Sequence, residues 1–140
     1  MRISVSKASE FLHKIGSGHD VRITSLSWQP DTRVLTVSCD DIFSAFQEMP
    51  ESPGPLAVNL VFSNITHFDV SIDSIDDYLS ISRITCTEVG DGLDTVFELW
   101  LQGTLHAVAK EMLIEYDAED AHRPAINKLL DILGRPEVSR

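Results

Sequence analysis

The chain has 140 residues, of which 43% are hydrophobic and 24% are charged, and its 22 acidic and 11 basic residues give a net charge of −11. This size and composition predict one domain, residues 1–140, with one hydrophobic core. The negative field argues against nucleic acid as a partner, because it repels a phosphate backbone. A membrane span is also excluded, because no run approaches the ~20 apolar residues that a span needs.

The N-terminal residues 6–15 predict a short helix. Ser6 suits the N-cap, and Gly16 suits the end of the helix because glycine tolerates the left-handed conformation found there. Apolar residues recur at helical spacing, namely Ala8, Phe11, Leu12 and Ile15. The same stretch lacks the apolar centre of a signal peptide, so we expect a cytoplasmic location.

The middle of the chain alternates with the period of β-strands. The expected strands cover residues 20–28, 33–39, 56–62, 65–72, 80–89 and 94–102. In the first of them the apolar alternation changes phase, which predicts a β-bulge near Thr24 and Ser25. Turn chemistry at 29–32 and 90–93 predicts two hairpins.

Residues 105–116 suit a helix face or a strand, and we predict a strand because a tight turn and another strand precede them. Residues 124–133 predict a helix: Pro124 suits its first turn, and the stripe Ile126, Leu129, Leu130 and Leu133 has helical spacing. The fold class is thus α+β and mainly β. We expect an antiparallel sheet of about six to seven strands, with the short N-terminal helix and the C-terminal helix packed on it.

No motif for catalysis or for metal binding is present. His19 and Asp20 open the first long strand, where adjacent side chains point to opposite faces, so we expect a structural pair rather than a base with its orienting carboxylate. The histidines, His13, His19, His67, His106 and His122, lack local ligand spacing. We therefore expect no cofactor and no bound transition metal. His67 and His106 are the best candidates for a site assembled from separate strands.

The two cysteines do not form a disulfide framework for a chain of this length. Cys39 and Cys86 each lie in an expected strand, where a buried free thiol behaves as a small hydrophobe. No nucleophile elbow or nucleotide-binding glycine pattern accompanies them. The sequence therefore predicts a protein that is not an enzyme.

The acidic residues are concentrated in the second half of the chain. Residues 1–70 hold five basic and eight acidic residues, whereas residues 71–140 hold six basic and 14 acidic ones. Carboxylates beside aromatic residues are typical of a surface that captures a basic protein, because charge speeds the encounter and aromatic groups supply the desolvated contact. The candidate protein-binding residues are Asp69, Asp73, Asp76, Asp77, Tyr78, Asp91 and Asp94.

The order of features resembles the small immunity proteins of bacterial polymorphic toxin systems and related uncharacterised bacterial families. The resemblance rests on the opening 19-HDVRITSLSW-28 and the later strand pair 56-LAVNLVFSNITHFDV-70, and it covers roughly residues 10 to 116. Val21 follows the His-Asp pair here, where such families often have glycine. The resemblance implies a non-enzymatic protein that binds and blocks a toxin.

Two other classes remain open on the sequence. Secretion chaperones of bacterial effectors are also small, acidic, cytoplasmic α+β proteins, and they commonly dimerise, although they interleave a helix between strands. A small-ligand-binding or enzymatic β-barrel would need a cavity with convergent polar groups.

Overall fold

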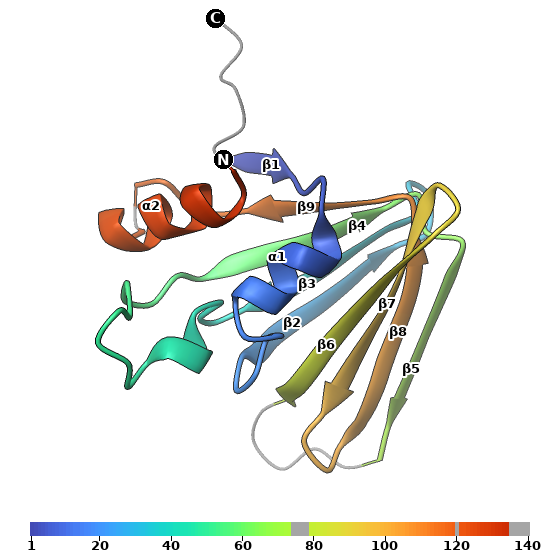
Figure 1. Ribbon diagram of the computed structural model, residues 1–140. Coiled ribbons are helices and arrows are strands. Elements are labelled where there is room, and N and C mark those ends of the chain that lie inside the picture. The colour runs from blue at the N-terminus through green and yellow to red at the C-terminus, as the bar shows by residue number, and fades with distance from the viewer. Residues whose placement is uncertain (74–78, 120, 135–140) are drawn as a thin grey trace, which may run out of the picture.

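The computed structural model describes residues 1–73, 79–119 and 121–134. In these residues nine strands form one open antiparallel sheet in the order β1-β9-β4-β3-β2-β6-β7-β8-β5 (Figure 1). The strands are β1 Arg2–Ser4, β2 Arg22–Gln29, β3 Val34–Cys39, β4 Val58–Ser63, β5 His67–Ile72, β6 Leu79–Val89, β7 Gly92–Leu99, β8 Gly103–Ala109 and β9 Glu111–Glu115. The helices are α1 Ala8–Lys14 and α2 Arg123–Ile132, and η1 Ser44–Phe46 is a 3-10 turn.

The mainly β fold with two helices is confirmed, but the expected number of six to seven strands is wrong. β1 has only three residues, too few for a periodic pattern. Residues 105–116 form two strands instead of one, because the chain changes direction at Lys110, whose backbone N–H donates to the carbonyl of Ser63 (3.1 Å).

Most other elements lie where the sequence predicts them. The pairing of β2 with β3 shifts its register between Ile23 and Ser25, which confirms the expected bulge. Residues 90 and 91 join β6 to β7 in a tight hairpin in which Val89 pairs with Gly92. α1 begins at Ala8 without a side-chain cap, so the expected cap at Ser6 is wrong.

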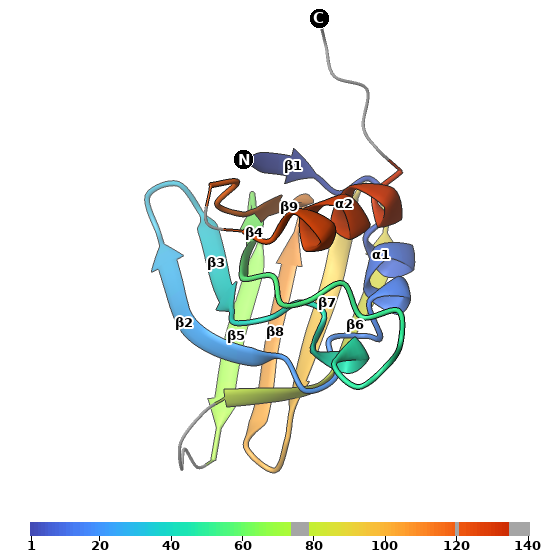
Figure 2. The same ribbon diagram turned by 90° about the vertical axis from the view of Figure 1, so that its left-hand side faces the viewer.

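The sheet folds over so that its two halves share one core. The first half is β1-β9-β4-β3-β2 and the second is β6-β7-β8-β5. Strand pairing connects them where Arg22 and Ile23 of β2 pair with the start of β6. Their inner faces meet at Phe62 of β4 and Phe97 of β7, whose ring centroids are 5.9 Å apart. Figure 2 shows the β2–β3 hairpin on the left of the view and β7 and β8 to its right; β2 approaches β5 where the rings of Trp28 and Phe68 lie 5.4 Å apart.

Both helices cover the core at the same end of the molecule (Figures 1 and 2). α1 buries Ala8, Phe11 and Leu12, and α2 buries Ile126 and Leu129. The described residues include no helix that is long and apolar enough to cross a membrane.

A buried carboxylate holds the loop between β3 and β4. Asp41 is only 6% exposed, and its Oδ1 atom accepts the backbone N–H groups of Phe43 (2.9 Å) and Leu56 (3.0 Å). The backbone of Ile42 also donates to the carbonyl of Leu56 (2.9 Å). A charged acceptor that is buried with two backbone donors contributes more than an ordinary hydrogen bond, so Asp41 joins the two ends of this loop, which contains Pro50, Pro53 and Pro55.

We expect Asp41→Ala to lower the free energy of unfolding by about 2–4 kcal/mol, because two buried N–H groups lose their acceptor. Asp41→Asn keeps one acceptor oxygen and should lower it less. The matched control is Asp40→Ala, since Asp40 accepts one exposed N–H group, that of Arg22. Urea unfolding measures all three variants; equal losses for Asp40→Ala and Asp41→Ala would contradict this role.

Candidate functional site

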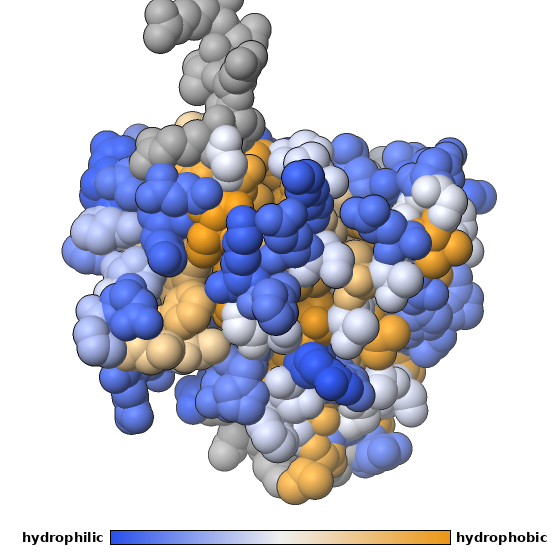
Figure 3. All heavy atoms as spheres, viewed as in Figure 1, coloured by the Kyte–Doolittle hydropathy of each residue, from blue (hydrophilic) through white to orange (hydrophobic). Residues whose placement is uncertain are grey.

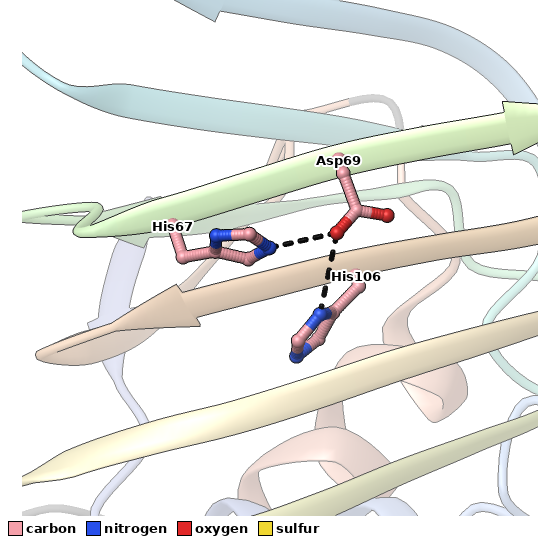
Figure 4. A group of neighbouring side chains, drawn as sticks. All are labelled: His67, Asp69 and His106. Carbon is pink, nitrogen blue, oxygen red and sulfur yellow. Dashed lines mark hydrogen bonds and ion pairs between the residues drawn. The ribbon is translucent and has the colours of Figure 1, made fainter.

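The outer face of the second half carries a cluster of histidines and carboxylates. Strand alternation places His67 and Asp69 of β5 on one face, and the register sets Asp69 directly opposite His106 of β8. Asp94 of β7 lies on the same face, one strand further on. Figure 4 shows His67, Asp69 and His106 converging from the two neighbouring strands. We call these four residues the histidine–aspartate cluster.

The four side chains form a continuous chain of contacts. The Nε2 atom of His67 lies 2.7 Å from Oδ2 of Asp69, and the same oxygen lies 3.5 Å from Nδ1 of His106. The other ring nitrogen of His106, Nε2, lies 2.6 Å from Oδ1 of Asp94. The two imidazole rings are 5.1 Å apart between centroids. Asp69 is thus shared by two imidazoles, and His106 is held between two carboxylates.

The electrostatics agree with this geometry. The hydrogen bond from His67 lowers the pKa of the Asp69 carboxyl, and the charge of His67 and the nearby His106 add to that effect. On the same face Arg83 of β6 pairs with Glu98 of β7 (2.7 Å), and this hydrogen bond raises the pKa of Arg83. The outer face is therefore built from paired charges.

The predicted acidic site does not form one surface. Asp69 and Asp94 belong to the histidine–aspartate cluster, whereas Asp91 lies in the β6–β7 hairpin and Asp73 follows β5 at the other end of the sheet. The expected site residues Asp76, Asp77 and Tyr78 lie outside the described residues. The single acidic patch expected from Asp69 to Asp94 is therefore wrong for the described carboxylates, because neighbours in sequence lie at opposite ends of long strands.

One end of the second half combines carboxylates with apolar groups. The backbone N–H of Asp73 donates to the carbonyl of Gln102 in the β7–β8 turn (2.7 Å). In that turn Trp100 is 45% exposed and Leu101 is 96% exposed. Hydrophobic atoms are visible at the lower end of the molecule, over this turn (Figure 3).

The His19-Asp20 pair belongs to this same end. The expected extended geometry is wrong: residues 15–20 form a turn, Asp20 has a φ of 65°, and Nε2 of His19 lies 3.5 Å from Oδ2 of Asp20. The ring of His19 packs edge-on against Trp100, with centroids 5.5 Å apart, and its Nδ1 atom lies 3.2 Å from the carbonyl of Ser82. We call Asp20, Asp73, Trp100 and Leu101 the acidic tip.

Sequence reasoning singled out His67 and His106 as candidates for a site assembled from separate strands, but it missed their partners Asp69 and Asp94, and it missed the acidic tip. The spacing His67-x-Asp69 in a strand places both side chains on one face, which a search for H-x-H patterns does not detect. The pairing of β5 with β8 is non-local, so the position of His106 opposite Asp69 follows only once the sheet order is known.

Both cysteines are buried free thiols, as the sequence predicts. Burial raises the pKa of Cys39 to about 12, and the nearby Asp40 charge adds to the effect. Burial also raises the pKa of Cys86. Neither environment favours the reactive thiolate.

We expect native Cys39 to react with a thiol reagent at pH 8 about a thousandfold more slowly than a free thiol, because its thiolate fraction falls with the raised pKa. A Cys86→Ser variant isolates this residue, and the reaction is followed by absorbance with an aromatic disulfide reagent. Labelling should become fast in denaturant. Fast labelling of the folded protein would contradict the buried environment.

Comparisons with known proteins give no information on the role of these residues. No family model and no curated protein matches the chain. Among solved structures, an uncharacterized protein from Neisseria gonorrhoeae is similar, with 15% identity and a TM-score of 0.48 over 68% of this chain and 90% of that chain.

Proposed function

We propose that this protein is a non-enzymatic cytoplasmic module that binds a basic protein through the acidic tip, in the manner of an immunity protein that blocks a basic toxin. The observation that carries the proposal is Leu101, a large apolar side chain that is 96% exposed at the end of the sheet. It is joined by the half-exposed Trp100 and by the carboxylates Asp20 and Asp73.

Leu101 contributes nothing to the core, and its backbone is unfavourable. Its φ is 54°, in the left-handed region that a residue with a Cβ adopts only at a cost of about 1–2 kcal/mol. Glycine or asparagine would suit this turn position better. Strain of this kind concentrates at functional positions, and an exposed leucine beside a tryptophan supplies the apolar centre of a protein contact.

The charges around this apolar centre favour a basic partner. Asp20 and Asp73 are exposed on either side of the turn, in a protein with a net charge of −11. The field of the whole molecule therefore attracts cationic surfaces, and the tip offers carboxylates at the rim of the contact. Asp69 and Asp94 each lie within 2.7 Å of a histidine nitrogen, whereas Asp20 has only a longer contact of 3.5 Å to Nε2 of His19.

We expect Leu101→Gly to separate binding from folding. Glycine relieves the left-handed strain, so the free energy of unfolding should stay unchanged or rise by up to about 1 kcal/mol. Partner affinity should fall at least about tenfold, since an exposed apolar anchor is lost. The partner is first captured from a lysate of the source organism at low salt and purified; calorimetry and urea unfolding then give the two quantities. Unchanged affinity would contradict the proposed contact.

Charge reversal tests the electrostatic part. Asp73→Lys should slow association with the purified partner by about threefold to tenfold at low salt and change dissociation less, because steering acts on encounter. Raising the salt concentration should reduce the difference between variant and parent. Surface plasmon resonance at several salt concentrations measures both rates.

The matched control is Asp31→Lys, which makes the same charge change in the β2–β3 turn, at the other end of β2 from the tip. It should slow association much less than Asp73→Lys. If both variants slow association equally, the net charge of the protein, rather than the acidic tip, determines the association rate. Capture that recovers no basic protein at low salt would overturn the proposed function. A toxin gene beside this reading frame supports the immunity type, whereas a secreted effector supports a chaperone.

A further inference from the structure

We propose that the histidine–aspartate cluster is a site for a divalent transition-metal ion of the zinc type, with Nε2 of His67, Oδ2 of Asp69 and Nδ1 of His106 as its three ligands. This inference is independent of the acidic tip, which lies elsewhere on the molecule. Imidazole nitrogens with one carboxylate oxygen form a donor set that zinc accepts, with three protein ligands and a further position open to solvent.

The distances suit such an ion. Zinc bonds of about 2.0–2.1 Å in a tetrahedral arrangement separate neighbouring donor atoms by about 3.3 Å. The oxygen of Asp69 lies 2.7 Å from the His67 nitrogen and 3.5 Å from the His106 nitrogen. One ligand atom from each of the three residues lies within 4.8 Å of the ligand atoms of the other two. Small side-chain rotations therefore suffice to place an ion between them.

Asp94 supplies the support that a metal-binding histidine needs. Its Oδ1 atom lies 2.6 Å from Nε2 of His106 and favours the tautomer with the proton on that nitrogen; in this tautomer Nδ1, 3.5 Å from Asp69, has its lone pair for an ion. A carboxylate behind a ligating histidine fixes the ring orientation and raises its basicity. His106 is also the least exposed member, with 29% of its side chain accessible, so its ring is already ordered.

The backbone and the charge favour the same conclusion. The ligands come from two strands joined by six consecutive residue pairs between His67 and Ile72, so their Cα positions are fixed by a ladder rather than by a loop. Asp69 and Asp94 bring two negative charges into one cluster, and a divalent cation between neutral imidazoles balances them. The site revises the sequence-based expectation of no transition metal, which considered only local spacing.

The test is a titration of the metal-free full chain with Zn²⁺ by isothermal calorimetry at pH 7.5. We expect one ion per chain with a Kd of about 10 µM or tighter. His67→Gln, Asp69→Asn and His106→Gln should each weaken binding at least about tenfold. Asp94→Asn, which leaves all three ligands, should weaken it about tenfold to a hundredfold through loss of the supporting carboxylate. Mg²⁺, which prefers oxygen ligands, should compete poorly.

His13→Gln is the control, because His13 is exposed on α1, outside the cluster. It should bind Zn²⁺ as the parent does. Proton NMR of the imidazoles should show His67 and His106 shifting on addition of the ion, and circular dichroism checks that the variants stay folded. No binding at 100 µM Zn²⁺, or binding that the His67 and His106 variants retain in full, would overturn the site.

Discussion

The contact between the inner faces of the two sheet halves is the constraint on which the rest of the structure depends. Phe62 and Phe97 meet edge to face in its centre, and both are fully buried. Side chains alternate between the two faces of a strand, so when these residues point into the core, the residues next to them in the strand point to the outer face. The outward positions of β5, β7 and β8 include His67, Asp69, Asp94 and His106, so the histidine–aspartate cluster follows from the packing of the core.

The sheet bends over itself because two of its strands, β4 and β8, end at the same place. Asn64, with a φ of 54°, ends β4, and Lys110 ends β8. The two strand ends lie side by side, since the N–H of Lys110 donates to Ser63 and the N–H of Thr66 donates to Val108 (2.9 Å). At this corner two chain segments pass together from one half of the sheet to the other, which allows the open sheet, with nine strands in the described residues, to enclose one core.

This corner also explains which parts of the fold the sequence predicts. Strands with uninterrupted alternation, the bulge in β2 and both helices follow from local patterns, because period and turn chemistry are properties of neighbouring residues. The division of 105–116 into β8 and β9 does not. Apolar residues alternate on both sides of Lys110, so the sequence pattern shows no end of a strand there. The pairing of β9 with β4 and of β8 with β5 shows that the two parts belong to different halves of the sheet.

The position of each acidic residue in the sheet decides its role. A count of carboxylates treats Asp69, Asp73 and Asp94 as equivalent, but the sheet gives two of them histidine partners and leaves Asp73 beside an exposed turn. Charges that are already compensated by neighbours add little to the long-range field, whereas uncompensated ones at a rim guide a partner. The protein therefore uses its acidic residues in two ways. On the outer face they order imidazoles, and at the tip they surround the apolar groups that folding leaves exposed.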